Sequence, residues 1–160
     1  MAEVSARLAE LGITLPDPPK PIASYIPAVS VPLGSPAAGR LVFVSGQIPT
    51  IKPGLLESTG PCPVVPAETA AKAARRCVVN ALAVLQAELG DLGKIRQIVK
   101  LDVFVNSDPQ WGDQPKVANG ASDLLVQIFG DAGKHARAAV GCPALPLNAT
   151  VEVALTVLAD

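Results

Sequence analysis

An arginine and a glutamate near the carboxyl end of the chain are the residues whose types and positions best suit chemistry on a small carboxylate. Arg137 and Glu152 both lie in segments with β-strand character. An arginine presents a planar fork of donors that fits a carboxylate, and a bidentate contact contributes on the order of 1.5 to 3 kcal/mol. A hairpin turning around Ala144 and Leu145 is expected to place the two side chains opposite each other. An ordinary cross-strand ion pair is the alternative interpretation.

The remaining reactive side chains predict no metal centre. His135 is the only histidine, so a histidine-rich metal site cannot be assembled, which leaves only carboxylate binding of a hard cation open. Cys62, Cys77 and Cys142 fit neither a disulfide framework nor a C-x-x-C pair. They favour the reducing cytoplasm. We interpret His135 as a hydrogen-bonded structural residue, with assistance in proton transfer as the alternative, and Cys142 as a packing residue.

Composition and charge exclude two classes of partner. A net charge of -1 and an isoelectric point near 5.8 give no field that would hold a phosphate backbone, so we expect no nucleic acid. Glu3, Arg7 and Glu10 interrupt the apolar residues of the amino terminus, which therefore lacks the core of a signal peptide. No stretch is apolar enough to span a bilayer, so we expect no membrane partner. A length of 160 residues predicts a single domain over 1–160.

The first 20 residues read as an addition to this domain. Apolar residues at helical spacing from Glu3 to Leu11, followed by Gly12, predict a short amphipathic helix. The segment from Pro16 to Pro21 is too rich in proline to be helical and predicts an extended arm. We therefore expect an amino-terminal helix and proline-rich arm over 1–20.

The rest of the chain alternates strands with helices. Leu41–Val44 predicts a strand that ends at Ser45–Pro49, and Thr50–Pro63 reads as a loop. Apolar residues at helical spacing predict a helix from Pro66 to Leu89, which Gly90 ends. The elements predicted after it are a long strand over Ile95–Val105, a helix opened by Pro115, a strand at Val140 and a last strand over Val151–Val157.

Two helices can cover only one face of such a sheet. The class is therefore α+β, with a mixed sheet and both helices on one side. Several strands are apolar on both faces, so we expect another copy of the subunit to bury the second face. The alternative is that the amino-terminal helix and arm cover it.

Four short motifs in a fixed order resemble the RidA/YjgF family of reactive-intermediate deaminases, also labelled L-PSP endoribonucleases. Arg137-Ala-Ala-Val140, Leu145-Pro146 and Val151-Glu152-Val153 resemble its carboxy-terminal signature. Pro21–Tyr25 resembles the family's Gly-Pro-Tyr-Ser region at its tyrosine, and Ser45–Pro49 is similar to its Ser-Gly-Gln segment. The strand Lys100–Val105 fits as well. The resemblance runs from about Pro21 to Val157.

The resemblance implies a Bacillus chorismate mutase-like fold that forms a trimeric barrel, a homotrimer with ligand sites between subunits. It also implies hydrolysis of enamines or imines of the 2-aminoacrylate type to 2-keto acids and ammonia, with no cofactor. Such a hydrolase would be a 2-iminobutanoate/2-iminopropanoate deaminase.

Roles carried over from the family fall on six positions, and Trp111 is added to them from a segment that departs from the family pattern. Arg137 would clamp the substrate carboxylate, and Glu152 would hold or activate the attacking water. The residues expected to bind substrate are Tyr25, Ser45, Gly46, Gln47 and, with less support from the pattern, Trp111.

The chain also departs from the family pattern. The amino-terminal helix and the long loop around Pro53 to Pro63 are additions, which indicates a longer subgroup. Asn106–Trp111 replaces the usual segment after the long strand, so Trp111 would reshape the pocket, and otherwise it is a packing anchor. A non-catalytic trimeric protein that binds or senses small carboxylates is therefore the alternative function. Endoribonuclease activity fits the acidic chain less well.

Overall fold

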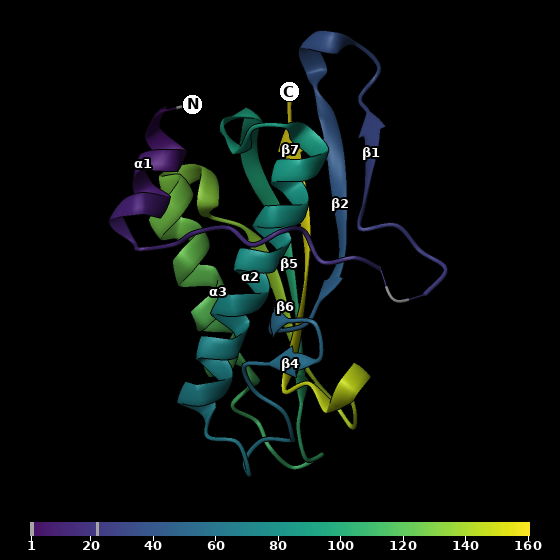
Figure 1. Ribbon diagram of the computed structural model, residues 1–160, viewed down its shortest axis with the longest axis vertical. Helices are drawn as coiled ribbons and strands as arrows, with labels where there is room; N and C mark the ends of the chain where they lie inside the picture. The colour runs from purple at the N-terminus through teal and green to yellow at the C-terminus, as the bar shows by residue number, and fades with distance from the viewer. Residues whose placement is uncertain (1, 22) are drawn as a thin grey trace.

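A five-stranded mixed sheet carries helices on one of its faces (Figure 1). The computed structural model describes residues 2–21 and 23–160. Met1 and Ile22, which belong to the predicted amino-terminal segment and to the Pro21–Tyr25 motif, lie outside the described residues. In chain order the elements are α1 (Ala2–Glu10), β1 (Ala28–Pro32), η1 (Pro36–Ala38), β2 (Arg40–Gln47), β3 (Thr50–Lys52), β4 (Leu55–Leu56), α2 (Ala67–Leu89), η2 (Leu92–Lys94), β5 (Ile95–Asn106), α3 (Gln114–Phe129), η3 (Gly130–Gly133), β6 (Ala136–Cys142), η4 (Pro146–Asn148) and β7 (Val151–Ala159).

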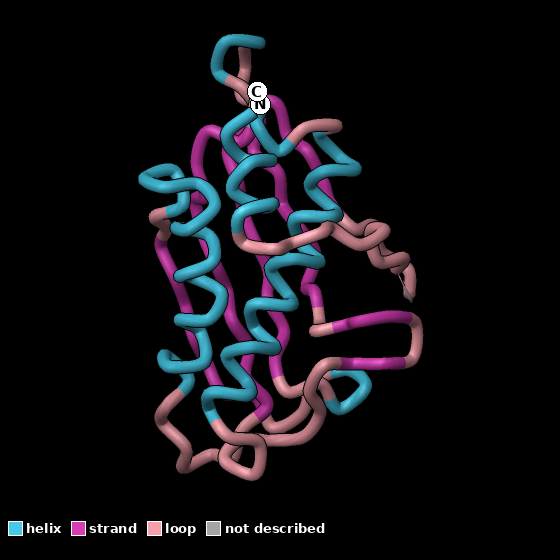
Figure 2. The backbone as a smooth tube through the Cα atoms, turned by 60° about the vertical axis from the view of Figure 1, so that its left-hand side comes forward, coloured by secondary structure: helices cyan, strands magenta, loops and turns pink. Residues whose placement is uncertain are grey.

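The strands lie in the order β1-β2-β7-β5-β6, with β5 and β6 parallel and the other neighbours antiparallel. Helices α2 and α3 pack side by side on one face (Figures 1 and 2). Gly120 permits their close approach, because a Cβ there would lie 2.0 Å from the carbonyl oxygen of Ala71. The predicted fold class, a mixed sheet with two helices on one face, is confirmed.

Buried and half-buried residues alternate strictly along β7, which shows which side of the strand faces the helices. Every second residue of β7, from Val151 to Ala159, is buried against the helices, and those between are half-buried on the other side. The buried stripe of α2 meets this face, and Gly90 ends the helix in a left-handed conformation with a φ of 77°. Burial of about 25 cal/mol per Å² of apolar surface on this single side drives the packing.

The hairpin expected around Ala144 and Leu145 does not exist. Strand β5 lies between β6 and β7, and β6 runs parallel to β5, so Arg137 and Glu152 are not cross-strand neighbours. The segment between β6 and β7 instead contains η4, where Leu147 and Asn148 both have a φ of 55°. Two prolines around the turn, at Pro143 and Pro146, are compatible with this irregular crossing but not with a tight hairpin.

The structure adds three strands to those predicted and lengthens a fourth. Strand β1 is an edge strand whose alternation is too short to stand out among prolines and glycines. Strands β3 and β4 form a small hairpin inside the segment predicted to be a loop. Strand β6 begins at Ala136 rather than at Val140.

The amino-terminal segment lies on the helical side of the sheet. Helix α1 contacts α3 and η2, and Leu8 joins the hydrophobic core. The proline arm crosses α2, where Pro18, Pro19 and Pro21 line a groove with Val84 and Ala87 (Figure 1). The alternative in which this segment covers the second face of the sheet is therefore wrong.

Neither the helices nor the amino-terminal segment covers the second face of the sheet, and large apolar side chains are exposed on its β1 and β2 strands. Register places Val29 and Val31 of β1 beside Phe43 and Leu41 of β2 on this face. Val29, Val31 and Phe43 are 46%, 44% and 45% exposed, which is high for large apolar side chains in paired strands. Among residues 2–21 and 23–160 no helix has the length and hydropathy needed to cross a membrane.

Candidate active site

A bulge in β2 creates a notch at Gly46, a small space that holds the carboxylate of Glu152. Val44 pairs with Leu155 and Gln47 with Val153. Between these two pairs β2 contains one more residue than β7. The extra residue falls at Ser45 and Gly46. A Cβ at Gly46 would lie 1.8 Å from Oε1 of Glu152, so only glycine leaves space for the carboxylate at this position.

Glu152 projects from β7 onto the open face of the sheet. It pairs with Phe104 of β5, on the side away from the helices, and is half-buried. Removal from water raises the pKa of the Glu152 carboxyl, because burial disfavours the charged form. A carboxyl with a raised pKa, in partial contact with solvent, is suited to exchanging protons with a substrate or a water molecule.

Ser45 and Gln47, the other predicted residues of the β2 motif, make different contacts near the notch. The Ser45 hydroxyl donates to the carbonyl oxygen of Ile26 at 2.7 Å, which ties β2 to the segment that carries Tyr25. Tyr25 itself is 43% exposed. Gln47 differs from the expectation, because its side chain is buried and its amide donates to the Ser45 carbonyl oxygen at 3.0 Å. Gln47 therefore stabilises the bulge from beneath instead of facing the open notch.

Arg137 lies on β6, at the opposite edge of the sheet from β1. Its guanidinium is exposed, and one nitrogen, Nη1, donates to Oδ1 of Asn119 at 2.9 Å and to the Ser122 hydroxyl at 3.0 Å. Both partners project from α3 toward β6, three residues apart and hence on one helix face. The guanidinium is anchored through Nη1, and because Arg137 is exposed, its other donors can bind a ligand.

A chain of hydrogen bonds continues from Arg137 to His135. The His135 ring lies with Nδ1 2.6 Å from the Gly133 carbonyl oxygen and Nε2 2.9 Å from the Ser122 hydroxyl. A carbonyl oxygen only accepts, so a neutral His135 carries its proton on Nδ1 and accepts from Ser122 at Nε2. Ser122 then donates to His135 and accepts from Arg137, so every group in the chain has one consistent role. The interpretation of His135 as a hydrogen-bonded residue is confirmed.

Arg137 and Glu152 lie on opposite faces of one sheet. Arg137 pairs with Leu101, on the helical side, whereas Glu152 pairs with Phe104, on the open side. The two are separated by two strand spacings, about 10 Å, and by about 10 Å along the strands. One small ligand therefore cannot contact both residues of a single chain.

Trp111 and Cys142 lie near the end of β5, away from the β2 bulge in sequence and strand order. Trp111 follows β5 and packs its half-buried ring against the core, and its carbonyl oxygen accepts from the Gln114 amide at 2.6 Å. Cys142 pairs with Asn106 at the end of β6 and is free. Within the described residues no group of three or more His, Cys, Asp and Glu side chains lies close enough to hold a metal ion.

Three residues of this site were missing from the sequence interpretation. Asn119 and Ser122 hold Arg137, and Asn80 of α2 donates to the carbonyl oxygens of Ile48 and Thr50 at 3.0 and 3.1 Å, just after the bulge. A buried asparagine in an otherwise apolar stripe was the available signal for Asn80. Asn119 and Ser122 gave no such signal, because polar residues on an exposed helix face are ordinary.

Known proteins resemble this chain along nearly its whole length. Residues 5–158 match the model of the family described as "YjgF/chorismate mutase-like, putative endoribonuclease". Protein TCP17 of Trypanosoma cruzi is 42% identical over 153 residues, which cover 94% of this chain and 90% of that protein. The crystal structure of Atu1372, a protein of unknown function from Agrobacterium tumefaciens, is 42% identical with a TM-score of 0.84 and covers 99% of this chain and 95% of its own.

A more distant relative has been solved with a bound ligand. The crystal structure of Escherichia coli TdcF with bound serine is 25% identical, with a TM-score of 0.59, over 90% of this chain and 94% of that one. The family match, the identity to TCP17 and the shared architecture agree with one another. The chain belongs to the YjgF/chorismate mutase-like family.

Proposed function

We propose that the protein hydrolyses small enamine and imine intermediates of the 2-aminoacrylate type to 2-keto acids and ammonia in the cytoplasm. The observation that supports the proposal is the presence of two suitable groups, one on each side of the sheet. Arg137 offers an exposed guanidinium fixed by Asn119 and Ser122, and Glu152 offers a half-buried carboxyl with a raised pKa beside Gly46. These are the two groups that such a substrate needs, an anchor for its carboxylate and a carrier for protons.

The reaction needs no other reagent than water. The enamine first takes a proton from solvent on its carbon to become the iminium ion. Glu152 then accepts a proton from water while the water oxygen bonds to the imine carbon, which gives a carbinolamine. Return of that proton to nitrogen allows the C–N bond to break, so that ammonia leaves. The hydroxyl then gives its proton to the Glu152 carboxylate, and the carbon keeps its oxygen as a ketone. The imine already hydrolyses in water, so positioning and one proton carrier supply the acceleration.

The site is proposed to form between two copies of the chain. Arg137 and Glu152 cannot reach one small ligand within a protomer, and the open sheet face carries exposed Phe43, Val29 and Val31 next to β2. Burying this face against the β6 edge of another copy would bring the two halves together. A closed ring of three copies satisfies this heterologous contact, and we propose a homotrimer.

The solved structure of TdcF with bound serine supports a ligand of this size and charge. Serine has the carboxylate and the amino-bearing carbon that an aminoacrylate substrate has. The anchoring role proposed for Arg137 requires only that carboxylate.

A coupled assay tests the proposal. A pyridoxal-phosphate-dependent serine/threonine dehydratase releases the enamine, and added protein is expected to speed keto acid formation, whereas Arg137→Ala is expected to give no acceleration. Absence of acceleration by the wild type with several amino acids would contradict the proposal. Stabilisation by keto acids without any turnover would instead favour a binding protein that senses small carboxylates.

A further inference from the structure

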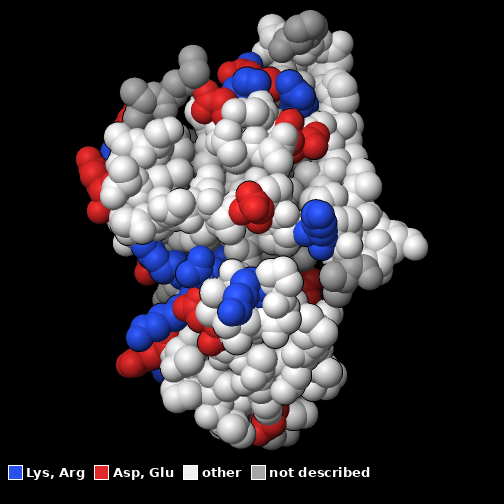
Figure 3. All heavy atoms as spheres, viewed as in Figure 1, with Lys and Arg blue, Asp and Glu red and all other residues white. Residues whose placement is uncertain are grey.

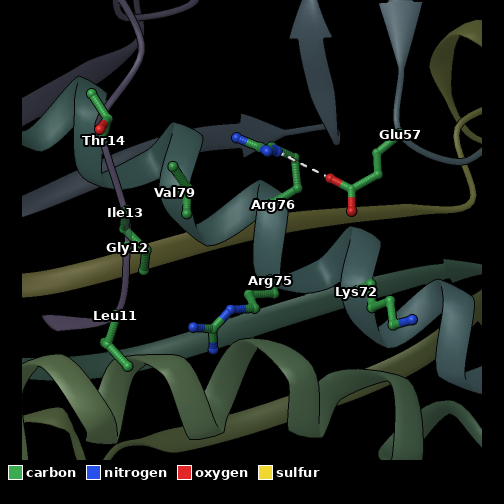
Figure 4. A pocket seen from close by; sticks show the side chains of 9 residues that line it. All are labelled: Leu11, Gly12, Ile13, Thr14, Glu57, Lys72, Arg75, Arg76 and Val79. Atoms are coloured by element: carbon green, nitrogen blue, oxygen red, sulfur yellow. Dashed lines mark hydrogen bonds and ion pairs between the residues drawn. The ribbon is translucent and has the colours of Figure 1, made fainter. Parts of the chain in front are cut away.

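A hollow lies on the helical side of the molecule, and neither Arg137 nor Glu152 is among the residues that line it. It has a volume of about 490 Å³, in the range of pockets that hold small metabolites. One wall is the segment Leu11–Thr14 that follows α1, and the floor is formed by Lys72, Arg75 and Arg76 of α2 (Figure 4). The space-filling view shows several Lys and Arg side chains, with Asp and Glu side chains beside them, around a recess in the middle of this side (Figure 3).

The cationic residues occupy one stripe of α2. Lys72, Arg75 and Arg76 stand at positions i, i+3 and i+4, so their side chains leave the helix in neighbouring directions. Val79 continues the stripe and also lines the hollow. Because the stripe runs along the outer side of a helix whose other side is buried, the three charges are held by a rigid element.

The charges of the hollow are largely uncompensated. Glu57 is the one carboxylate that lines it, and it pairs with Arg76 at 3.0 Å. Arg75 donates to the neutral amide oxygen of Gln127 at 3.1 Å, and neither Arg75 nor Lys72 belongs to an ion pair within 2–21 and 23–160. Three positive charges against one negative leave a net charge of +2 around the hollow.

We propose that this hollow binds the phosphoryl group of a small phosphorylated metabolite. A phosphate monoester carries a charge of about -1.5 to -2, which matches the excess of the lining. Its three terminal oxygens accept from several directions, as the spread of Arg75, Arg76 and Lys72 along α2 requires, whereas a carboxylate offers two oxygens in one plane. The Thr14 side chain at the rim adds a hydroxyl.

The amino-terminal segment thereby acquires a role. Helix α1 packs on α3 and η2, and the chain then turns at Gly12, with a φ of 66°, to run along α2. Figure 4 shows Arg75 extended toward Leu11 and Gly12, and Arg76 joined to Glu57 through its Nε. Without this segment the basic stripe would lie on an open helix surface, where water would screen it.

Titration calorimetry with glycerol 3-phosphate at constant ionic strength tests the proposal. Wild-type protein is expected to bind it, and Arg75→Gln is expected to weaken binding roughly tenfold or more. Lys72→Gln, an exposed position, should weaken it as well and serves if Arg75→Gln does not fold. Glu57→Gln is expected to tighten binding several-fold, because it removes the opposing charge and releases Arg76.

Matched controls separate a built site from a general charge effect. Lys116→Gln removes the same charge from α3, outside the hollow, and should leave the affinity unchanged, as should Arg137→Ala. Succinate, a dianion without a phosphoryl group, should bind much more weakly than glycerol 3-phosphate to the Arg137→Ala protein, in which the proposed carboxylate anchor is absent. The proposal is overturned if no binding occurs at millimolar concentrations, if succinate binds equally well, or if Lys116→Gln weakens binding as much as Lys72→Gln.

Discussion

The Glu152 carboxyl carries both the proposed chemistry and a cost to stability. Burial raises its pKa, so the folded chain holds the proton more tightly than the unfolded chain does. Stability therefore falls as pH rises from the unfolded pKa, about 4.3, through the raised folded value. An amide of the same shape avoids this cost but cannot transfer protons.

Glu152→Gln is accordingly expected to lower turnover by about 10²- to 10⁴-fold while raising the melting temperature at neutral pH. The gain in melting temperature should shrink as pH falls and vanish below the pKa of the unfolded glutamate. Thermal unfolding of both proteins across pH 4 to 8 measures this. A variant less stable than the wild type at neutral pH would contradict the account of the raised pKa.

Ser122 acts on the substrate only through Arg137. Its hydroxyl accepts from the guanidinium and lies 2.9 Å from Nε2 of His135, so Ser122→Ala leaves Arg137 with one anchor, Asn119. We expect KM to rise about fivefold, for about 1 kcal/mol of lost positioning, with kcat nearly unchanged. Steady-state kinetics give the two constants separately, and Ser5→Ala on exposed α1 is the control. Unchanged KM would show that Ser122 has a purely structural role.

At the scale of elements, the β2 bulge decides where the carboxylate sits. Gly46→Ala places a Cβ 1.8 Å from Glu152 Oε1 and 3.1 Å from its Cγ, so the flexible side chain must move and the strands need not. We expect a protein of nearly unchanged melting temperature that has lost most of its activity. Gly112→Ala is the control, since a Cβ there meets nothing within 4 Å. Full activity in Gly46→Ala would contradict the proposed role of the notch.

The spacing of apolar residues in the sequence predicts those helices and strands that bury one side along their whole length. The long helix α2, the strands β5 and β7 and the buried side of α3 follow from it, because apolar residues at a spacing of 3.6 or 2 leave few alternatives. The close backbone approach at Gly46 was visible too, from a glycine after the β-prone run, although β2 continues through the bulge to Gln47 instead of ending there. The motif identified Arg137 and Glu152 as candidates, but no local pattern gives their relative placement.

The errors of the sequence interpretation arise where neighbours in space are distant in the chain. A hairpin between β6 and β7 was the simplest connection, yet β5 pairs with both strands and separates them. Strand β1 was hidden because an edge strand of five residues needs only one partner and little hydrophobic alternation. Asn119 and Ser122 reach Arg137 only because α3 packs over β6, and the sequence does not show this packing.

At the scale of the whole molecule, the proposed homotrimer depends on burial of the open sheet face. Phe43 of β2 is 45% exposed on this face, between Val29 of β1 and Thr156 of β7. Phe43→Asp is expected to convert trimers to monomers in sedimentation and to abolish turnover, because a charge cannot be buried there without a partner. Val64→Asp, at a loop residue 79% exposed, is the control. Monomeric wild-type protein, or an active Phe43→Asp monomer, would contradict the shared site.

Mixing two inactive variants tests the shared site most directly. Arg137→Ala and Glu152→Gln are each expected to be inactive, and equal amounts unfolded and refolded together should form mixed trimers. A site that takes Arg137 from one copy and Glu152 from the next is intact in about one quarter of random interfaces, so about a quarter of wild-type activity should return. Activity no greater than that of the separate variants would show that the two residues do not meet across an interface, and the account would be wrong.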